Sequence, residues 1–162
     1  MGMYREQDPL AAFIKREQSR VLERLMQFAD GEGRGVLADA RDVLRALAAV
    51  ETEVLYPAFS RVRLRLETER LLDDSRGDRA EQLAGLDVLA HKRAARSRKL
   101  AAVKLIDLIK HHDEQLTTLL IPVLASQLPR PLYHSIVHAF IAHYEGKVHQ
   151  GGGAERRQPS YA

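Results

Sequence analysis

Three polar residues fall where helical spacing places apolar side chains: Gln18, Glu51 and His112. Glu51 lies about 40° from Leu47 around a helix, and His112 lies in the middle of its own apolar stripe. Buried carboxylates are rare and need partners. A carboxylate and an imidazole in one core can hold a metal ion or bond to each other, whereas a buried amide can be a weak ligand, part of a proton relay or a hydrogen-bonded core group. The spacing therefore predicts polar groups in the core, with either a functional or a structural role.

A second polar group lies near the C-terminus, where His134, His138 and Glu145 fall within about 40° of one another around a helix. Two imidazoles four residues apart can hold a metal ion or contact a second subunit. The same three residues also flank an apolar stripe, and such a flank is ordinarily solvated. The stripe consists of Ile136, Val137, Phe140, Ile141 and Tyr144.

Several kinds of site are excluded by the residues that the chain lacks. It has no cysteine, and therefore no disulfide, cysteine-bound zinc, iron–sulfur cluster or thiol nucleophile. It has no glycine-rich phosphate loop, no Ser-His-Asp order and no His-Glu-x-x-His pattern. With no catalytic constellation to name, we expect a protein that is not an enzyme.

Length and composition indicate one all-helical domain. The chain has 162 residues, no tryptophan, and a preponderance of Leu, Ala, Arg and Glu, which is typical of helical proteins. The longest apolar run, around Leu119, is broken by Pro122 and is far shorter than the ~20 residues that a membrane helix needs. The N-terminus has no apolar signal segment. We therefore expect a cytoplasmic protein that does not contact a membrane.

The charge is balanced overall but uneven along the chain. Lys and Arg number 25 against 22 Asp and Glu, a formal net charge of +3 that does not argue for nucleic acid. A basic run without acids spans residues 92–99 and is either a solvated helix face or turn, or a phosphate-contacting patch. No aromatic residue interleaves with it, so base stacking has no support and we expect no nucleic-acid partner.

Cap and breaker residues divide the chain into helices. Asp8 followed by Pro9 predicts a helix start, and the glycines of residues 31–35 predict its end. A second helix is expected from about residue 36 and weakens near Pro57. Residues 75–77 predict a break, after which Asp78 caps a third helix. The remaining boundaries are expected as a turn at 96–99, a break at 128–131 and a last helix at 132–145.

These amphipathic helices, joined by short loops, predict an antiparallel bundle. We expect the bundle to span residues 8–128, with an additional helix at 131–146 that packs its Phe140 and Tyr144 side chains on the bundle or on a second subunit. Residues 1–7 and 150–162 are expected to be flexible termini, since the C-terminal segment is of low complexity.

The chain also carries a sign of internal duplication. With a shift of 65 residues, residues 47–59 align with residues 112–124, and Pro57 falls on Pro122 within matching apolar patterns. Proline is costly inside a helix, so its recurrence at the same place favours duplication over chance.

In these segments the chain resembles the hemerythrin-like (HHE) cation-binding family. That family carries Asp-His in its first helix, His-x-x-x-Glu ahead of Leu-Phe/Tyr-Pro in its second, and a similar His-plus-acid motif ahead of Leu-Phe-Pro in its fourth. The resemblance covers roughly residues 8–128 and implies an all-α, up-down four-helix bundle. The matching pieces are Asp8-Pro9-Leu10, Glu51 followed by Leu55-Tyr56-Pro57-Ala58-Phe59, and His111-His112 followed by Leu120-Ile121-Pro122.

The resemblance implies a diiron site, but several of its ligands are missing from this chain. Such a site needs imidazoles from different helices and bridging carboxylates, but no histidine precedes His91. The family's Asp-His falls on Glu17-Gln18, its second-helix His falls on Leu47, and its last acid falls on Leu116 or Thr117. Only Glu51 and His112 match outright, and His91 is the candidate for the third-helix ligand although it lies about 110° from its apolar stripe.

The resemblance therefore implies a degenerate metal site and a non-enzymatic sensory, regulatory or interaction module without a bound cofactor. The alternative is an iron-binding protein in iron or oxygen handling, which holds iron or another divalent metal at low occupancy through Glu51, His112, His91 and Gln18. A homodimer or a protein partner fits either alternative. In both, we expect Glu51 and His112 to face the same core layer, within direct or water-mediated reach.

Overall fold

The computed structural model describes residues 7–154, with side chains described as far as residue 149, and this part of the chain is all-helical, as expected. The expected flexible termini lie largely outside the described residues, although residues 150–154 belong to the last helix. The long helices are α1 (Pro9–Ala29), α2 (Gly35–Val50), α4 (Leu66–Ala90), α5 (Ala95–Gln115) and α7 (Arg130–Ala154). The short elements are η1 (Glu51–Leu55), α3 (Tyr56–Ala58), η2 (Phe59–Arg61), η3 (Leu116–Leu120) and α6 (Ile121–Gln127).

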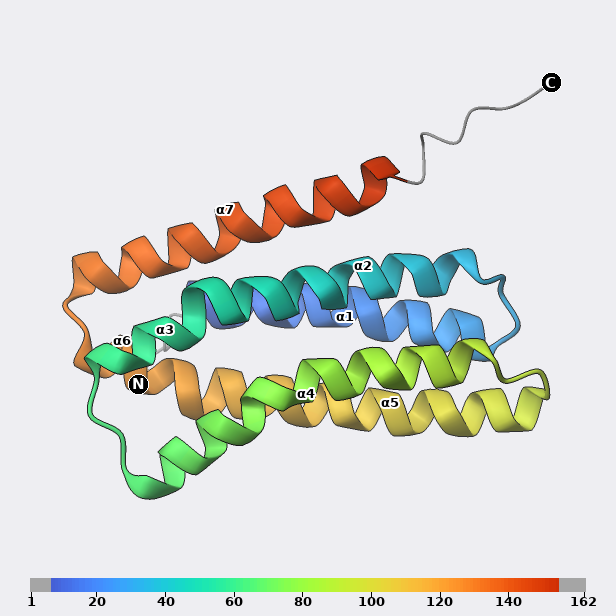
Figure 1. Cartoon of the computed structure of the whole chain (residues 1–162), viewed down its shortest axis with the longest axis horizontal. Coiled ribbons are helices and arrows are strands. Elements are labelled where there is room, and N and C mark those ends of the chain that lie inside the picture. Colours follow the sequence, from blue (N-terminus) through green and yellow to red (C-terminus); the bar gives the residue numbers. More distant parts are fainter. Residues whose placement is uncertain (1–6, 155–162) are drawn as a thin grey trace, which may run out of the picture.

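The long helices pack around one apolar core, to which α7 also contributes side chains. Helices α1 and α4 each contact both α2 and α5, while α7 lies against α2 and α1. In Figure 1, α1 and α2 accordingly lie between α7 on one side and α4 with α5 on the other. No helix in the described range combines the length and apolarity that a membrane span requires. The most completely buried apolar side chains include Leu10, Ile14, Leu25, Leu44, Leu47, Leu86, Leu89, Ile109, Leu116 and Leu120.

Helix α1 begins and ends at the residues that the sequence predicts. The Asp8 carboxylate accepts hydrogen bonds from the backbone N–H groups of Leu10 and Ala11, which would otherwise lack a partner in the first turn. At the other end, Gly31 has a φ of +102°, a conformation that glycine adopts without steric strain. The Glu32 N–H then bonds back to the Gln27 carbonyl, which ends the helix and turns the chain toward α2.

The two aligned segments of the sequence share one backbone irregularity. The π-helical turns η1 and η3 are related by the same 65-residue shift, and each is followed by a proline at the second position of the next helix. In each, an N–H bonds to the carbonyl five residues earlier: Tyr56 to Glu51, and Ile121 to Leu116. A proline ring clashes with the carbonyl four residues before it, so a wider turn relieves the clash. The expected weakening near Pro57 thus takes the form of a π turn.

The expected break at residues 75–77 is wrong, because α4 runs without interruption through them. Ser75 and Arg79 are buried on the same face of α4 as Leu72 and Leu86, and this packing outweighs the cost of about 1 kcal/mol for a glycine inside a helix. Asp78 is therefore not a helix cap.

Two further boundaries also differ from expectation. The turn between α4 and α5 lies at residues 91–94 and not at 96–99, and α7 continues past Gly146. Gly146 does not adopt the positive φ with which a glycine commonly ends a helix, and α7 passes through it.

Helix α7 is joined to α1 of the same chain through aromatic side chains. Phe140 is fully buried, and the Phe13 ring meets Phe140 and Tyr144 edge to face, with ring centroids 6.2 and 5.1 Å apart. Two hydroxyl groups add directed bonds: Tyr144 donates to Glu17 at 2.6 Å and Tyr133 donates to Asp8 at 2.5 Å. Burial, followed by the hydrogen bond to a carboxylate, raises the pKa of both tyrosines.

Candidate functional site

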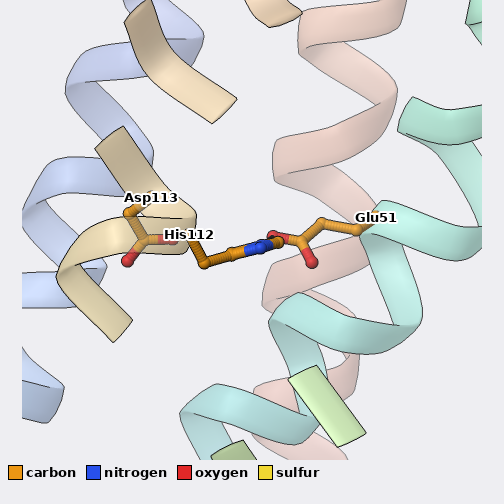
Figure 2. Close-up of side chains that lie close together, drawn as sticks. All are labelled: Glu51, His112 and Asp113. Atoms are coloured by element: carbon orange, nitrogen blue, oxygen red, sulfur yellow. Dashed lines mark hydrogen bonds and ion pairs between the residues drawn. The ribbon is translucent and has the colours of Figure 1, made fainter. Parts of the chain in front are cut away.

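The core contains a cluster of charged and polar side chains from three elements. Glu51 comes from η1, Arg79 and Gln82 from α4, and His112 and Asp113 from α5. All five, which we call the buried ionic cluster, are between 0% and 3% exposed. Figure 2 shows the His112 ring extending from α5 toward the Glu51 carboxylate. A group of charges this deeply buried is stable only if its members pair with one another.

Arg79 connects the members of the buried ionic cluster. Its Nε lies 3.2 Å from both carboxylate oxygens of Glu51, and its Nη2 lies 2.9 Å from Glu51 Oε1. The same Nη2 donates to Asp113 Oδ1 at 2.6 Å, and Nη1 donates to Gln82 Oε1 at 2.8 Å. One guanidinium thus bridges two carboxylates from different helices, which its planar fork of donors suits well.

His112 connects the buried ionic cluster to a partly exposed residue, Asp78. Its Nε2 lies 3.4 Å from Glu51 Oε1, and its Nδ1 lies 2.8 Å from Asp78 Oδ2. The Asp78 side chain is 28% exposed, so it forms the outer end of a line of polar groups that reaches Glu51 and Arg79. Both ring nitrogens face carboxylate oxygens, and the protonated imidazole therefore satisfies both by donating to each.

These contacts shift the pKa values of the cluster in different directions. Burial by itself would raise the pKa of Glu51, but the Arg79 charge and the His112 hydrogen bond outweigh burial and lower it to about 2. For His112, burial would lower the pKa, yet the hydrogen bond to Glu51 raises it. Burial raises the pKa of Asp113 in spite of Arg79. The Glu51–Arg79 pair is therefore firmly ionised.

The residues of the cluster do not fit a metal ion while Arg79 is in place. Glu51, His112 and Asp113 each offer a ligand atom within 4.8 Å of one another, and in the described range this is the one such group. However, Arg79 already donates to Glu51 Oε1 and Asp113 Oδ1. A metal on those oxygens would lie beside a fixed positive charge in a medium of low dielectric constant, where repulsion is strong.

Two buried polar atoms in the cluster have no hydrogen-bond partner among the described residues: Gln82 Nε2 and Asp113 Oδ2. Each belongs to a group whose other polar atom bonds to Arg79. An unpaired buried group costs about 1–3 kcal/mol. The cluster is thus held mainly through Arg79.

The structure brings together two of the four predicted site residues. Glu51 and His112 are both buried and in direct reach of each other, as expected. His91 is not part of this site: it is exposed at the end of α4, where Nδ1 lies 2.6 Å from the Asp87 carbonyl. Gln18 is only half-buried, because α1 turns the preceding residue, Glu17, into the core toward Tyr144.

Three members of the cluster were not predicted, namely Arg79, Gln82 and Asp113. The signal for the first two is their spacing in α4, where the buried residues are Leu72, Ser75, Arg79, Gln82, Leu86 and Leu89. The expected break before Asp78 divides this segment, so the spacing of these residues along one helix was not recognised. Asp113 directly follows His112 in the last turn of α5, and both are buried in a helix that packs against both α1 and α4.

Tyr56 is a further side chain of the core with a polar group. It is buried, and its hydroxyl group donates to the Ser75 carbonyl at 3.2 Å and lies 3.0 Å from Ser75 Oγ. Burial raises the pKa of the Tyr56 hydroxyl. The residue therefore joins α3 to the middle of α4.

The remaining candidate residues lie on the surface. His134, His138 and Glu145 are exposed on α7, which favours the polar-flank interpretation. The basic run at residues 92–99 covers the turn before α5 and its first residues, and most of its side chains are exposed. Arg98 is the exception, since its guanidinium packs over the Phe28 ring at 5.3 Å.

Comparisons with family models, curated proteins and solved structures find no significant match to this chain.

We expect Glu51 and His112 to be energetically coupled. Glu51→Gln and His112→Gln should each lower the free energy of unfolding, since each leaves a buried partner with a weaker contact. The double variant should cost less than the sum of the two, with a coupling of about 0.5–3 kcal/mol. Urea denaturation of the four proteins measures this, and strict additivity would show that the 3.4 Å contact contributes nothing.

Proposed function

We propose that this chain is a hemerythrin-like up-down four-helix bundle with an added C-terminal helix, in which the Arg79 guanidinium stands where the family holds its metal. In this proposal the protein is a non-enzymatic regulatory or interaction module, acting as a homodimer or with a protein partner. The observation that supports it is the bridge from Arg79 to Glu51 and Asp113, made at 2.9 and 2.6 Å in a fully buried place.

The charges of the cluster support this proposal. A diiron centre needs carboxylates to neutralise its metals and imidazoles to complete their coordination. Here the carboxylates of Glu51 and Asp113 are already paired with a guanidinium, and His112 is the one imidazole in the cluster. Its Nδ1 is directed at Asp78 and its Nε2 at Glu51. The donor set is thus used within the protein.

A second candidate function is the binding of a single divalent metal by Glu51, His112 and Asp113. The observation that favours it is the 4.8 Å grouping of their ligand atoms. Metal binding would require the Arg79 side chain to leave both carboxylates, so the two functions exclude each other at any one moment.

Metal content separates the two candidates. We expect wild-type protein, expressed with added iron and purified without chelator, to contain substoichiometric metal and to have no oxygen-dependent visible band. Arg79→Ala frees both carboxylates and should raise the affinity for Zn²⁺ by about tenfold or more. Arg41→Ala, which removes a surface guanidinium paired with Asp87, is the control and should leave Zn²⁺ binding unchanged.

The contrary results are equally clear. One iron per wild-type chain would favour the second candidate. Two irons with an oxygen-dependent band would support an oxygen-binding function. Equal Zn²⁺ affinity in wild type and Arg79→Ala would show that Arg79 does not oppose the metal.

A further inference from the structure

A cleft separates the segment around α3 from the first half of α4. It has a volume of about 770 Å³ and lies between Tyr56, Pro57 and Phe59 on one side and Leu72 with Glu69 on the other. In Figure 1 the first turns of α4 lie apart from α3, and the segment of residues 62–65 connects the two regions. A volume of this size suits a small organic molecule, since ligand sites commonly measure roughly 300–1,000 Å³.

A smaller cavity continues the cleft toward the core. It has a volume of about 200 Å³, shares Thr52, Tyr56 and Arg76 with the cleft, and reaches Glu51 and Arg79 at its inner end. The two cavities therefore adjoin at these three residues, and the smaller one is also lined by two members of the buried ionic cluster.

The floor of the cleft is apolar and rigidly held. Phe59 is 3% exposed and Leu72 is 5% exposed, so both are fixed in the core while contributing to the cleft wall. Tyr56 is fixed by its hydrogen bond to Ser75. The more accessible side chains of Pro57 and Leu64 complete the apolar lining. Together these surfaces suit an apolar or aromatic body, which gains free energy by leaving water.

The polar groups of the cleft mostly accept hydrogen bonds. The hydroxyl hydrogens of Thr52 and Ser60 are donated to the backbone carbonyls of Ala48 and Pro57, and that of Tyr56 to Ser75. These oxygen atoms retain lone pairs but have no further hydrogen to donate. Apart from the Arg76 guanidinium, the polar side chains of the cleft therefore offer few free donors to an incoming ligand.

The charges of the cleft point the same way. Glu69 and Asp73 lie one helical turn apart on α4, both exposed and without an ion-pair partner in the described part of the chain. The one cationic side chain of the outer cleft is Arg76, whose guanidinium lies 5.9 Å from the centre of the Tyr56 ring. Two carboxylates against one guanidinium leave the rim negative, so the complementary ligand carries a positive charge and donates hydrogen bonds.

We propose that this cleft binds a small organic amine with an apolar or aromatic body. The ammonium group bonds to Glu69 and Asp73, and the body packs on Phe59, Tyr56 and Leu72. The inference goes beyond the proposed function and does not depend on it, because neither rim carboxylate belongs to the buried ionic cluster.

The test is an amide NMR titration of the full chain with phenethylamine, a primary amine with an aromatic body. Saturable shifts are expected for amides in residues 56–60 and 69–76. Methylamine, which has the charge without the body, and 3-phenylpropionate, which has the body with the opposite charge, should each bind about tenfold more weakly or worse.

A matched pair of variants locates the charge effect. Glu69→Gln with Asp73→Asn should weaken phenethylamine binding by about tenfold. Glu67→Gln with Asp74→Asn makes the same charge change on exposed residues of α4 that do not line the cleft, and should leave the affinity unchanged. The proposal is overturned if no saturable shift occurs, if the carboxylate or methylamine binds as tightly as phenethylamine, or if both double variants weaken binding equally.

Discussion

Replacing Arg79 with leucine is expected to lower the free energy of unfolding by about 3–5 kcal/mol, because it removes the shared partner of two buried carboxylates and leaves Asp113 unpaired and Glu51 with His112 alone. Glu51 is 0% exposed and Asp113 is 1% exposed, so water cannot replace the guanidinium without opening the core. Chemical denaturation measures the loss, and circular dichroism shows whether the variant is still folded.

Two controls separate charge burial from the loss of an arginine side chain. Arg41→Leu removes an ion pair with Asp87, whose side chain is 67% exposed, and should cost no more than about 1 kcal/mol. The triple variant Arg79→Leu, Glu51→Leu, Asp113→Leu removes all three charges, and should recover most of the stability lost in the single variant. If Arg79→Leu costs no more than Arg41→Leu, the buried ionic cluster does not hold the core together.

Phe140→Asp is expected to release α7 from α1 and α2, or to unfold the chain. Truncating a buried phenylalanine costs about 3–5 kcal/mol, and the new carboxylate would face Phe13 in an apolar contact without a partner. Thermal unfolding and hydrogen exchange of the α7 amides measure the effect. If the other helices stay folded, the stability lost in this variant cannot exceed the free energy with which α7 docks on them.

The matched control is Ala142→Asp, which adds the same charge at an exposed position of α7. It should leave both the melting temperature and the exchange protection of α7 close to wild type. If Phe140→Asp behaves in the same way as this control, α7 does not depend on its aromatic face for docking.

Local signals in the sequence predict the ends of α1 and a weakening of the helix near Pro57. The Asp8 cap and Gly31 define the ends of α1 through backbone bonds that depend on neighbouring residues alone. Pro57 and Pro122 act on the turn just before them, so their recurrence anticipates two similar elements. The all-helical composition adds the fold class.

Helix α4 shows where local signals fail. Ser75, Arg76 and Gly77 have the character of a break, but the face formed by Leu72, Ser75 and Arg79 is buried against other helices. Tertiary contacts outweigh a small difference in helix propensity. Helix propensity alone therefore predicts a break that the packing of α4 overrides.

The candidate site was half predictable for a related reason. Glu51 and His112 interrupt clear apolar stripes, so their burial follows from spacing. Arg79 does not look like a core residue, because arginine is almost never buried unless it is paired. Its partners lie 28 and 34 residues away in the sequence, and only the assembled helices bring them within reach.

The guanidinium of Arg79 is synthesised with the chain, one copy per molecule, and keeps its charge at any pH in a living cell. In a metalloprotein the free energy of metal binding is also folding free energy, so the fold weakens when the metal becomes scarce. A covalently attached cation cannot dissociate from the protein, whatever the concentration of metal in the solution. Starvation for iron or treatment with a chelator therefore leaves the charge between Glu51 and Asp113 in its place.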